Sequence, residues 1–180
     1  PTGKDLRFNW STPIVLSPWN GSVVYVGSNK LHRSTNRGAS WEVISPDLTT
    51  NDPAKQRVGE GSVSPESTSA EVHCTIITIG ESPREAGVLW VGTDDGYVQL
   101  SKDNGATWTN VTPKPETGLP AGTWVSRVTP SRMNAGRCYA TFDNHRRGDF
   151  KPYVMKTEDY GQTWTPLQNG LAPNESCYVI

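Results

Sequence analysis

The densest group of residues able to do chemistry is a polar run, Asp143-Asn-His-Arg-Arg-Gly-Asp149. His145, Arg146 and Arg147 could clamp a carboxylate or phosphate group, because a guanidinium binds such groups with two parallel hydrogen bonds. The alternative is a solvated surface loop with internal Arg–Asp pairs. We favour this alternative, because charged residues on a surface usually have no specific role and their ion pairs contribute little to stability. We therefore carry His145, Arg146, Arg147 and Asp149 forward as candidate ligand-binding residues.

Two adjacent carboxylates, Asp94 and Asp95, stand directly before Gly96. Such carboxylates can bind sugar hydroxyls or a metal ion. The Asp-Asp-Gly sequence also lies between two apolar runs, which is typical of a tight hairpin turn. The turn is the simpler interpretation, and Asp94 and Asp95 remain candidate ligand-binding residues beside it.

A neighbouring His–Cys pair, His73-Cys74, could act as a nucleophile. Adjacent strand residues point to opposite faces of a sheet, so we disfavour this pair. Cys74 and Cys138 lie in apolar runs and are expected to be buried free thiols. The 3 cysteines show no Cys-x-x-Cys spacing, so we predict no metal centre and no cofactor.

Composition excludes some classes of partner. The 180 residues carry 17 Lys and Arg against 18 Asp and Glu, for a net charge of −1. No basic excess is present to bind phosphates, so we expect no nucleic-acid ligand. No apolar run is long enough for a transmembrane segment.

One octet recurs along the chain and indicates a repeat protein. Its pattern is [Ser/Thr]-x-[Asp/Asn]-x-Gly-x-[Ser/Thr]-Trp, and it occurs 3 times, whereas roughly 0.003 accidental matches are expected. The defining residues are Ser34, Asn36, Gly38 and Trp41, then Ser101, Asp103, Gly105 and Trp108, then Thr157, Asp159, Gly161 and Trp164. The Asp or Asn suits an Asx-type turn, the Gly allows positive φ, and the Trp supplies a large apolar ring between sheets.

Short apolar runs flank each octet at similar spacing, which predicts four antiparallel strands per unit with the octet as the third turn. No amphipathic helical window competes with them. The expected strands are 13–18, 23–27, 30–33 and 42–44, then 75–79, 88–92, 97–100 and 109–111, then 124–130, 138–142, 152–156 and 165–167.

The octet resembles the Asp-box, or bacterial neuraminidase repeat, which marks the blades of one class of β-propeller. That class includes sialidases, xyloglucanase-type glycosidases, sortilin-type receptors and a photosystem assembly factor. The strings Arg7-Phe-Asn-Trp-Ser-Thr-Pro13 and Asp149-Phe-Lys-Pro-Tyr153 resemble bacterial proteins described as sortilin-like or glycosyl-hydrolase-like. The resemblance implies an all-β fragment of a propeller made of three consecutive four-stranded blades, in which Asn36 replaces the usual Asp.

We place blade 1 at about 11–46, blade 2 at about 72–113 and blade 3 at about 124–168, with the start of a further blade at 176–180. Three blades cannot close a ring, so we expect a chain that is incomplete at both ends. Partners would then be the remaining blades of the same propeller, or another chain that completes the ring. The resembled fold puts the octets on one rim and the long connections 47–71, 114–122 and 143–151 on the opposite face. We expect 47–71 to be a mobile insertion; a lid or partner-contact arm is the alternative.

The resemblance leaves several functions open. A glycosidase needs two carboxylates across a cleft, and no spacing here selects two among Asp94, Asp95, Asp143 and Asp149. The sialidase motif Phe/Tyr-Arg-Ile-Pro is missing from the sequence. We therefore assign no catalytic residue and predict a non-catalytic binding or scaffold module for a protein or glycan. Part of a glycoside hydrolase and an assembly factor for a membrane complex are the alternatives. The expected location is extracellular, periplasmic or in the cell envelope.

Overall fold

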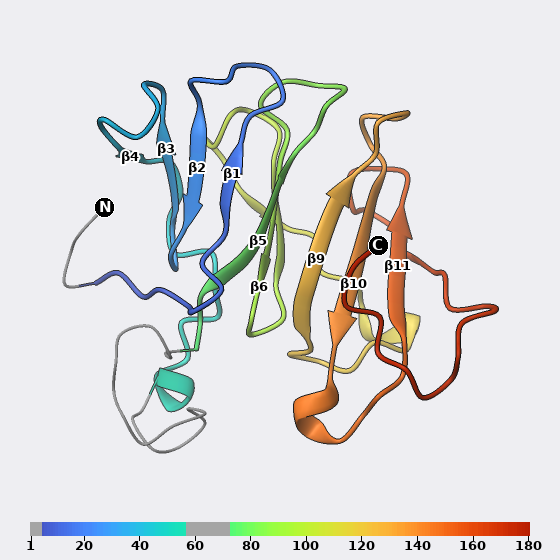
Figure 1. Cartoon of the computed structure of the whole chain (residues 1–180). Helices are drawn as coiled ribbons and strands as arrows, with labels where there is room; N and C mark the ends of the chain where they lie inside the picture. The colour runs from blue at the N-terminus through green and yellow to red at the C-terminus, as the bar shows by residue number, and fades with distance from the viewer. Residues whose placement is uncertain (1–4, 57–72) are drawn as a thin grey trace.

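The computed structural model describes residues 5–56 and 73–180, and these form an all-β structure of three four-stranded antiparallel sheets. We call the sheets blades 1 to 3, and Figure 1 shows them side by side in chain order. Blade 1 contains β1 (Ile14–Leu16), β2 (Val24–Gly27), β3 (Leu31–Ser34) and β4 (Glu42–Val43). Blade 2 contains β5 (Ile76–Glu81), β6 (Leu89–Thr93), β7 (Val98–Ser101) and β8 (Thr109–Asn110). Blade 3 contains β9 (Trp124–Pro130), β10 (Cys138–Asp143), β11 (Tyr153–Thr157) and β12 (Thr165–Pro166).

Within every blade each strand pairs with its neighbour in sequence, so the expected all-β fold of three four-stranded antiparallel blades is confirmed. The octets follow β3, β7 and β11, all at the upper edge in Figure 1. Three short 3-10 helices, η1 (Pro53–Gln56), η2 (Pro115–Thr117) and η3 (His145–Arg147), lie toward the opposite edge. We call the two edges the octet face and the loop face.

The three octets form the same turn. In the third, Thr157 Oγ1 donates to Asp159 Oδ1 (2.8 Å) and accepts from the Gly161 amide (2.9 Å), while Asp159 Oδ1 accepts from the Thr163 amide (2.9 Å). The other two octets repeat these three contacts with the equivalent residues. The predicted Asx-type turn is therefore a self-contained hydrogen-bond circuit.

The middle of each octet is left-handed. The Gly at its fifth position has φ of 91°, 92° and 79° along the chain, as the sequence predicts. The preceding residue, which is Arg37, Asn104 or Tyr160, is also left-handed, with φ of 58–60°. That second positive φ is costly for an ordinary residue and is a feature that the sequence pattern does not reveal.

The octet tryptophans join consecutive blades. Trp108 Nε1 donates to the Ile44 carbonyl of blade 1 (3.0 Å), and Trp164 Nε1 donates to the Val111 carbonyl of blade 2 (2.7 Å). Both acceptors directly follow the last strand of the preceding blade. The partly buried Trp41 forms no hydrogen bond with any residue of the described ranges.

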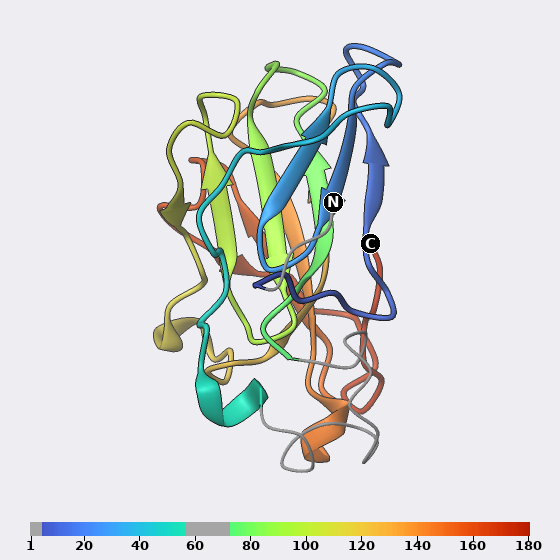
Figure 2. The ribbon, with the colours of Figure 1, turned by 90° about the vertical axis from the view of Figure 1, so that its left-hand side faces the viewer.

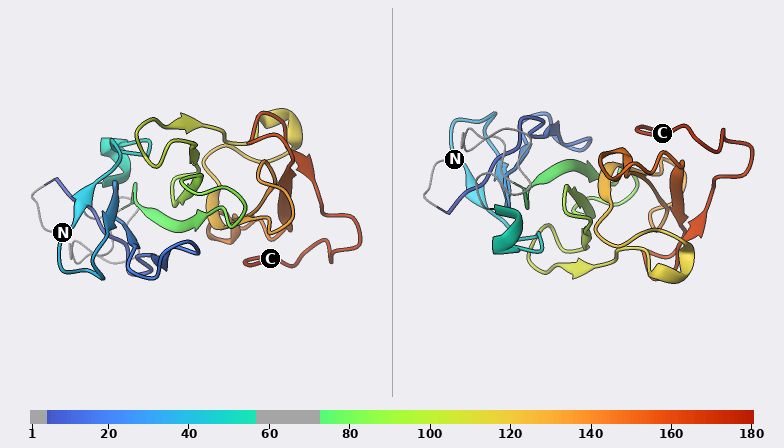
Figure 3. Two further views of the ribbon diagram at one scale, coloured as in Figure 1. Left: turned by 90° about the horizontal axis from the view of Figure 1, so that it is seen from above. Right: turned by 90° about the horizontal axis from the view of Figure 1, so that it is seen from below.

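The core lies between the blades. One buried cluster joins blades 1 and 2 through Tyr25, Leu31, Leu48, Ile76, Ile79, Leu89 and Val91. A larger one joins blades 2 and 3 around Trp90, Val125, Phe142 and Met155. The close approach of consecutive blades depends on Gly27 and Gly92. A Cβ added at Gly27 would lie 2.7 Å from Ile76 Cγ2, and one added at Gly92 would lie 2.5 Å from Val125 Cγ1. Figure 3 shows the resulting row of three sheets from above and below.

The connections on the loop face have apolar anchors that the sequence analysis did not identify. Leu48 is 1 % exposed and Leu119 is 6 % exposed, and each packs into a core cluster. Figure 2 shows the segment leading to η1 running down beside the blades. The rest of the 47–71 connection, from residue 57, lies outside the described residues, so its expected mobility stays a prediction.

At the C-terminus, residues 176–180 form no strand, although the Thr141 hydroxyl donates to the Tyr178 carbonyl (2.9 Å). The expected start of a further blade stays a prediction, as do the other blade bounds. Within residues 5–56 and 73–180, no helix has the length and apolar character required to cross a bilayer.

Candidate functional site on the loop face

The Asp94-Asp95-Gly96 sequence forms the hairpin turn between β6 and β7, and Gly96 has φ of 100°. Asp94 is 3 % exposed; its carboxylate accepts from the Thr75 amide (2.9 Å), the Thr75 hydroxyl (2.6 Å) and Asn9 Nδ2 (3.3 Å). Burial raises the pKa of Asp94, against the opposing effect of the Thr75 hydrogen bonds. This carboxylate ties the N-terminal segment to blade 2.

Asp95 is equally buried and fastens the connection between blades 1 and 2. It accepts from the Thr50 amide (2.8 Å), the Thr50 hydroxyl (2.6 Å) and the Thr93 hydroxyl (2.6 Å). Both aspartates thus have structural partners within the fold, and a ligand role for them stays a prediction.

A second network beside these turns is centred on Asp47. Its Oδ2 accepts from Arg7 Nη2 (2.6 Å) and Asn29 Nδ2 (2.8 Å), and Arg7 Nε also donates to the Cys74 carbonyl (3.2 Å). Burial alone would raise the pKa of Asp47, but hydrogen bonds from Thr49, Asn29 and Arg7 outweigh it and hold that pKa below its usual value. Sequence analysis did not identify Arg7 and Asp47, which are 40 residues apart.

The loop between β10 and β11 is organised by its own side chains. Asp149 accepts from Asn144 Nδ2 (3.0 Å) and the Tyr153 hydroxyl (2.7 Å), and these bonds lower the pKa of Asp149. Burial, together with Asp149, raises the pKa of Tyr153 to about 12. Arg147 Nη1 donates to the Ala121 carbonyl (2.9 Å). Within the described residues neither loop arginine pairs with a carboxylate, so the Arg–Asp pairs weighed from the sequence do not form.

Arg146 is placed over an aromatic ring. Its guanidinium carbon lies 4.1 Å from the centroid of the Trp124 ring, a cation–π arrangement. His73 meets the same ring edge-on, with 6.2 Å between centroids, and lies 3.9 Å from Asp94 Oδ2. The indole Nε1 of Trp124 is buried without a hydrogen-bond partner among the described residues. This cluster joins blades 2 and 3 at the loop face.

His145 completes the group of candidates. Its Nδ1 hydrogen-bonds to Asp143 Oδ2, while its side chain is 44 % exposed. Two large aromatic side chains lie on the same face, Trp10 (73 % exposed) before β1 and Phe150 (53 % exposed) after η3. The loop face therefore combines buried carboxylates with exposed aromatic and cationic side chains.

The His73 side chain faces Trp124 and Asp94, whereas the Cys74 thiol contacts Thr50 and Asp52, so the two side chains are not paired. Burial raises the pKa of the Cys74 thiol to about 11, and Asp95 acts in the same direction. Cys74 and Cys138 are buried free thiols, as the sequence predicts. No group of three or more His, Cys, Asp or Glu side chains suited to a metal occurs within residues 5–56 and 73–180.

Comparison with known proteins identifies the fold. No family model matches the chain, and no curated protein matches it. An ancestral GH74 enzyme matches at 16 % identity over 98 % of this chain and 21 % of its own, with a TM-score of 0.61. A GH74 xyloglucanase from Xanthomonas campestris matches at 18 % identity over 89 % of this chain and 23 % of its own, with a TM-score of 0.56.

YCF48 from Cyanidioschyzon merolae matches at 13 % identity over 95 % of this chain and 43 % of its own, with a TM-score of 0.55. YCF48 bound to D1 peptide also matches, at 12 % identity over 92 % of this chain and 46 % of its own, with a TM-score of 0.50. The chain thus spans about a fifth of the GH74 enzymes and under half of YCF48. Identities this low show the fold alone: the three sheets are consecutive blades of a β-propeller.

Proposed function

We propose that this chain is an Asp-box propeller arc that acts as a non-catalytic binding or scaffold module for a protein or glycan partner. The observation that carries the proposal is the loop face, which presents exposed Trp10, Phe150 and Arg146 beside turns that are fixed by internal hydrogen bonds. Aromatic residues and Arg are enriched at the centres of protein interfaces. This composition favours a protein segment as the partner of the loop face. The match to YCF48 bound to D1 peptide supports the same interpretation.

The test is selection of peptides from a random displayed library on the full chain, followed by fluorescence polarisation with the selected peptides. We expect the double variant Trp10→Ala/Phe150→Ala to weaken binding about tenfold or more. The matched control is Met133→Ala, an 81 % exposed side chain on the octet face, which should leave binding unchanged. Equal binding by both variants would place the interaction elsewhere.

A glycoside hydrolase is the second candidate, because GH74 enzymes share the fold. Two carboxylates would have to face one cleft, whereas Asp94, Asp95 and Asp143 are at most 4 % exposed and hydrogen-bonded within the fold. Release of reducing sugar from xyloglucan, or of sialic acid from a sialoglycan, would replace the binding proposal with catalysis. An assembly factor for a membrane complex is a third candidate, which co-purification with a membrane partner would support.

We further propose that other blades of the same polypeptide, or another chain, complete the ring. Leu167 directly follows β12, as Ile44 follows β4 and Val111 follows β8, so its carbonyl is the equivalent acceptor for a next octet tryptophan. Trp41 is the equivalent donor on blade 1. The intact mass of the native polypeptide distinguishes the cases: a mass well above 19.7 kDa indicates further blades in the same chain. The proposed extracellular, periplasmic or envelope location is tested by cell fractionation.

A further inference from the structure

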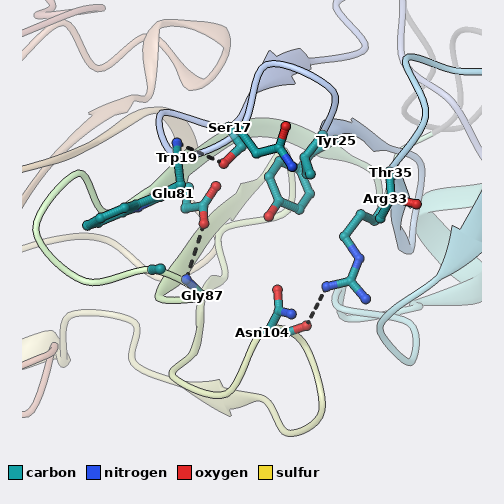
Figure 4. Close-up of a pocket in the computed structure, with 11 residues that line it drawn as sticks. Ser17, Trp19, Tyr25, Arg33, Thr35, Glu81, Gly87 and Asn104 are labelled. Atoms are coloured by element: carbon teal, nitrogen blue, oxygen red, sulfur yellow. Dashed lines mark hydrogen bonds between the residues drawn. The ribbon is translucent and has the colours of Figure 1, made fainter.

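A pocket of about 370 Å³ lies on the octet face between blades 1 and 2, away from the loop face. Its volume falls within the range of about 300–1,000 Å³ that small-molecule sites occupy. Six side chains around the hollow carry the argument: Trp19, Asn20, Tyr25, Arg33, Glu81 and Asn104. They come from both blades, and Figure 4 shows Glu81 and Asn104 of blade 2 facing Trp19, Tyr25 and Arg33 of blade 1.

Glu81 is the most unusual member of the wall. It is 9 % exposed, and its Oε1 accepts a single hydrogen bond, from the Gly87 amide (3.1 Å). The other oxygen, Oε2, is buried and has no hydrogen-bond partner among the described residues. A buried carboxylate oxygen without a donor is costly. Figure 4 shows the Glu81 carboxylate between Trp19 and Tyr25. A hydrogen-bond donor on a ligand in the pocket can therefore reach Oε2.

Tyr25 supplies a hydroxyl at the same point. The residue is 2 % exposed, and burial together with the nearby Glu81 carboxylate raises its pKa above the ordinary value. The hydroxyl therefore stays protonated throughout the physiological range. It can act as both donor and acceptor at the base of the pocket.

Trp19 and Arg33 frame the opening. Trp19 is 51 % exposed yet fixed in place, because its amide bonds to Ser17 Oγ (3.1 Å) and its indole Nε1 bonds to the Ser82 carbonyl (2.8 Å). Arg33 is held by Glu42 (2.8 Å) and by the Asn104 carbonyl (3.4 Å). An aromatic ring held in this way presents its face without a further ordering cost.

Between blades 2 and 3, the positions equivalent to Tyr25, Glu81 and Arg33 carry no charged side chain. The strand registers match Tyr25 with Trp90, Glu81 with Pro130 and Arg33 with Leu100. Trp90 and Leu100 are at most 4 % exposed and belong to one hydrophobic cluster. The fold therefore does not require a carboxylate or a guanidinium at these positions, and the presence of both between blades 1 and 2 points to a ligand.

We propose that the pocket formed by Trp19, Tyr25, Glu81 and Arg33 is a binding site for a neutral saccharide. One carboxylate and one guanidinium line it, so their charges balance: Glu81 repels an anion and Arg33 repels a cation. Sugar hydroxyls can donate to Glu81 and accept from Arg33 and the two asparagines. The C–H groups of a pyranose ring suit the negative face of the Trp19 indole.

The test is isothermal titration calorimetry of the full chain with cellobiose, lactose and xylotriose, supported by saturation-transfer NMR. We expect at least one of these sugars to bind. Trp19→Ala and Glu81→Gln should each weaken that binding about tenfold or more, since they remove the ring face and the charged acceptor. Met133→Ala is the matched control, because Met133 occupies the position of Trp19 on blade 3, and it should change nothing.

Charged probes and folding controls make the outcome decisive. Tighter binding of glucuronic acid or glucosamine than of the neutral sugars would overturn the neutral class. Absence of binding by all three neutral sugars would overturn the proposal itself. If Trp19→Ala unfolds the chain, the isosteric variants Glu81→Gln and Tyr25→Phe decide instead. The loop-face double variant Trp10→Ala/Phe150→Ala should retain sugar binding, which separates this site from the proposed function.

Discussion

The interface between blades 1 and 2 and the interface between blades 2 and 3 share some contacts and differ in others. Both use an octet tryptophan that donates to the preceding blade, Trp108 in one and Trp164 in the other. Both use a glycine in the second strand, Gly27 or Gly92, to admit the next inner strand. Because these contacts recur at both interfaces, we infer that they are the part of the interface that the fold itself requires.

The interfaces differ toward the octet face. Between blades 2 and 3 the positions are filled by Trp90, Pro130 and Leu100, whereas between blades 1 and 2 they hold Tyr25, Glu81 and Arg33. A buried carboxylate with an unpartnered oxygen costs stability, and Pro130 at the equivalent position shows that the fold does not require a carboxylate there. The contacts shared by both interfaces and the proposed binding site therefore occupy separate parts of one repeated interface.

Loss of an octet tryptophan should destabilise the fold most. Replacing Trp108 or Trp164 with Ala should lower the free energy of unfolding by about 3 kcal/mol, because each loses ring packing and an interblade hydrogen bond. Trp41→Ala should cost about 1 kcal/mol, since Trp41 has no hydrogen bond to the described residues. Urea denaturation of the three variants checks the order. A Trp41 loss equal to the other two would instead show that a further sheet packs on blade 1.

Acidification should weaken blade 1 before blade 3. His32 is fully buried in β3, and burial, aided by Lys30, lowers its pKa from 6.5 to about 4. A lowered pKa means that the folded state binds fewer protons, so stability falls as the pH drops from 6.5 to 4, by about 2–3 kcal/mol.

The equivalent residue in β11 is Met155, which does not titrate. Hydrogen exchange at pH 4.5 and pH 7 should therefore show a larger loss of protection in β2 and β3 than in β10 and β11. His32→Met is the control that should remove the difference. Equal loss in both blades would exclude His32 as its source.

The close-approach glycines test whether the shared contacts are equivalent. A Cβ at Gly92 would lie 2.5 Å from Val125 Cγ1, and one at Gly27 would lie 2.7 Å from Ile76 Cγ2. Gly92→Ala and Gly27→Ala should each cost about 1–3 kcal/mol through overpacking. Gly21→Ala is the control, with no atom within 4 Å of the added Cβ. Thermal unfolding of the three variants measures the costs, and a harmless Gly92→Ala would mean that the blades can move apart freely.

Strands and octets were predictable because they depend on residues close in sequence. Hydrophobic alternation and turn residues placed all twelve strands near their observed bounds, and three matches to one pattern fixed the turns. The loop-face contacts were not predictable in this way. Arg146 packs over Trp124, and Arg7 binds Asp47. The residues of each pair are far apart in the sequence, and only the packing of the folded chain brings them together.

The octet-face pocket was missed for a related reason. Tyr25, Arg33 and Glu81 come from three strands of two blades, and each alone fits an ordinary alternating strand. A signal was nevertheless present, since aligning the three units sets Glu81 against Leu16 and Pro130. A single charged residue at a position that is otherwise apolar is the kind of difference that marks a site in a repeat protein.

The first octet, where Asn36 stands in place of Asp, offers only a small gain in stability. Asn36 Nδ2 donates to the Ser40 hydroxyl (2.9 Å), whereas in the third octet the Thr163 hydroxyl donates to Asp159 Oδ2 (2.6 Å). Asn36→Asp would let Ser40 donate to a carboxylate, but the turn is exposed, so the gain in the free energy of unfolding should be about 0.5 kcal/mol or less.

The equivalent Asp159 of the third octet indicates how this gain should depend on pH. Slight burial would raise the pKa of Asp159, but hydrogen bonds from Thr163 and Thr157 outweigh it and lower that pKa. A lowered pKa stabilises the fold only above the ordinary Asp range, so the gain from Asn36→Asp should vanish as the pH falls below about 4. Urea denaturation at pH 7 and pH 3 measures both values. A gain that persists at pH 3 would mean that it arises from the backbone preference of Asp rather than from its charge.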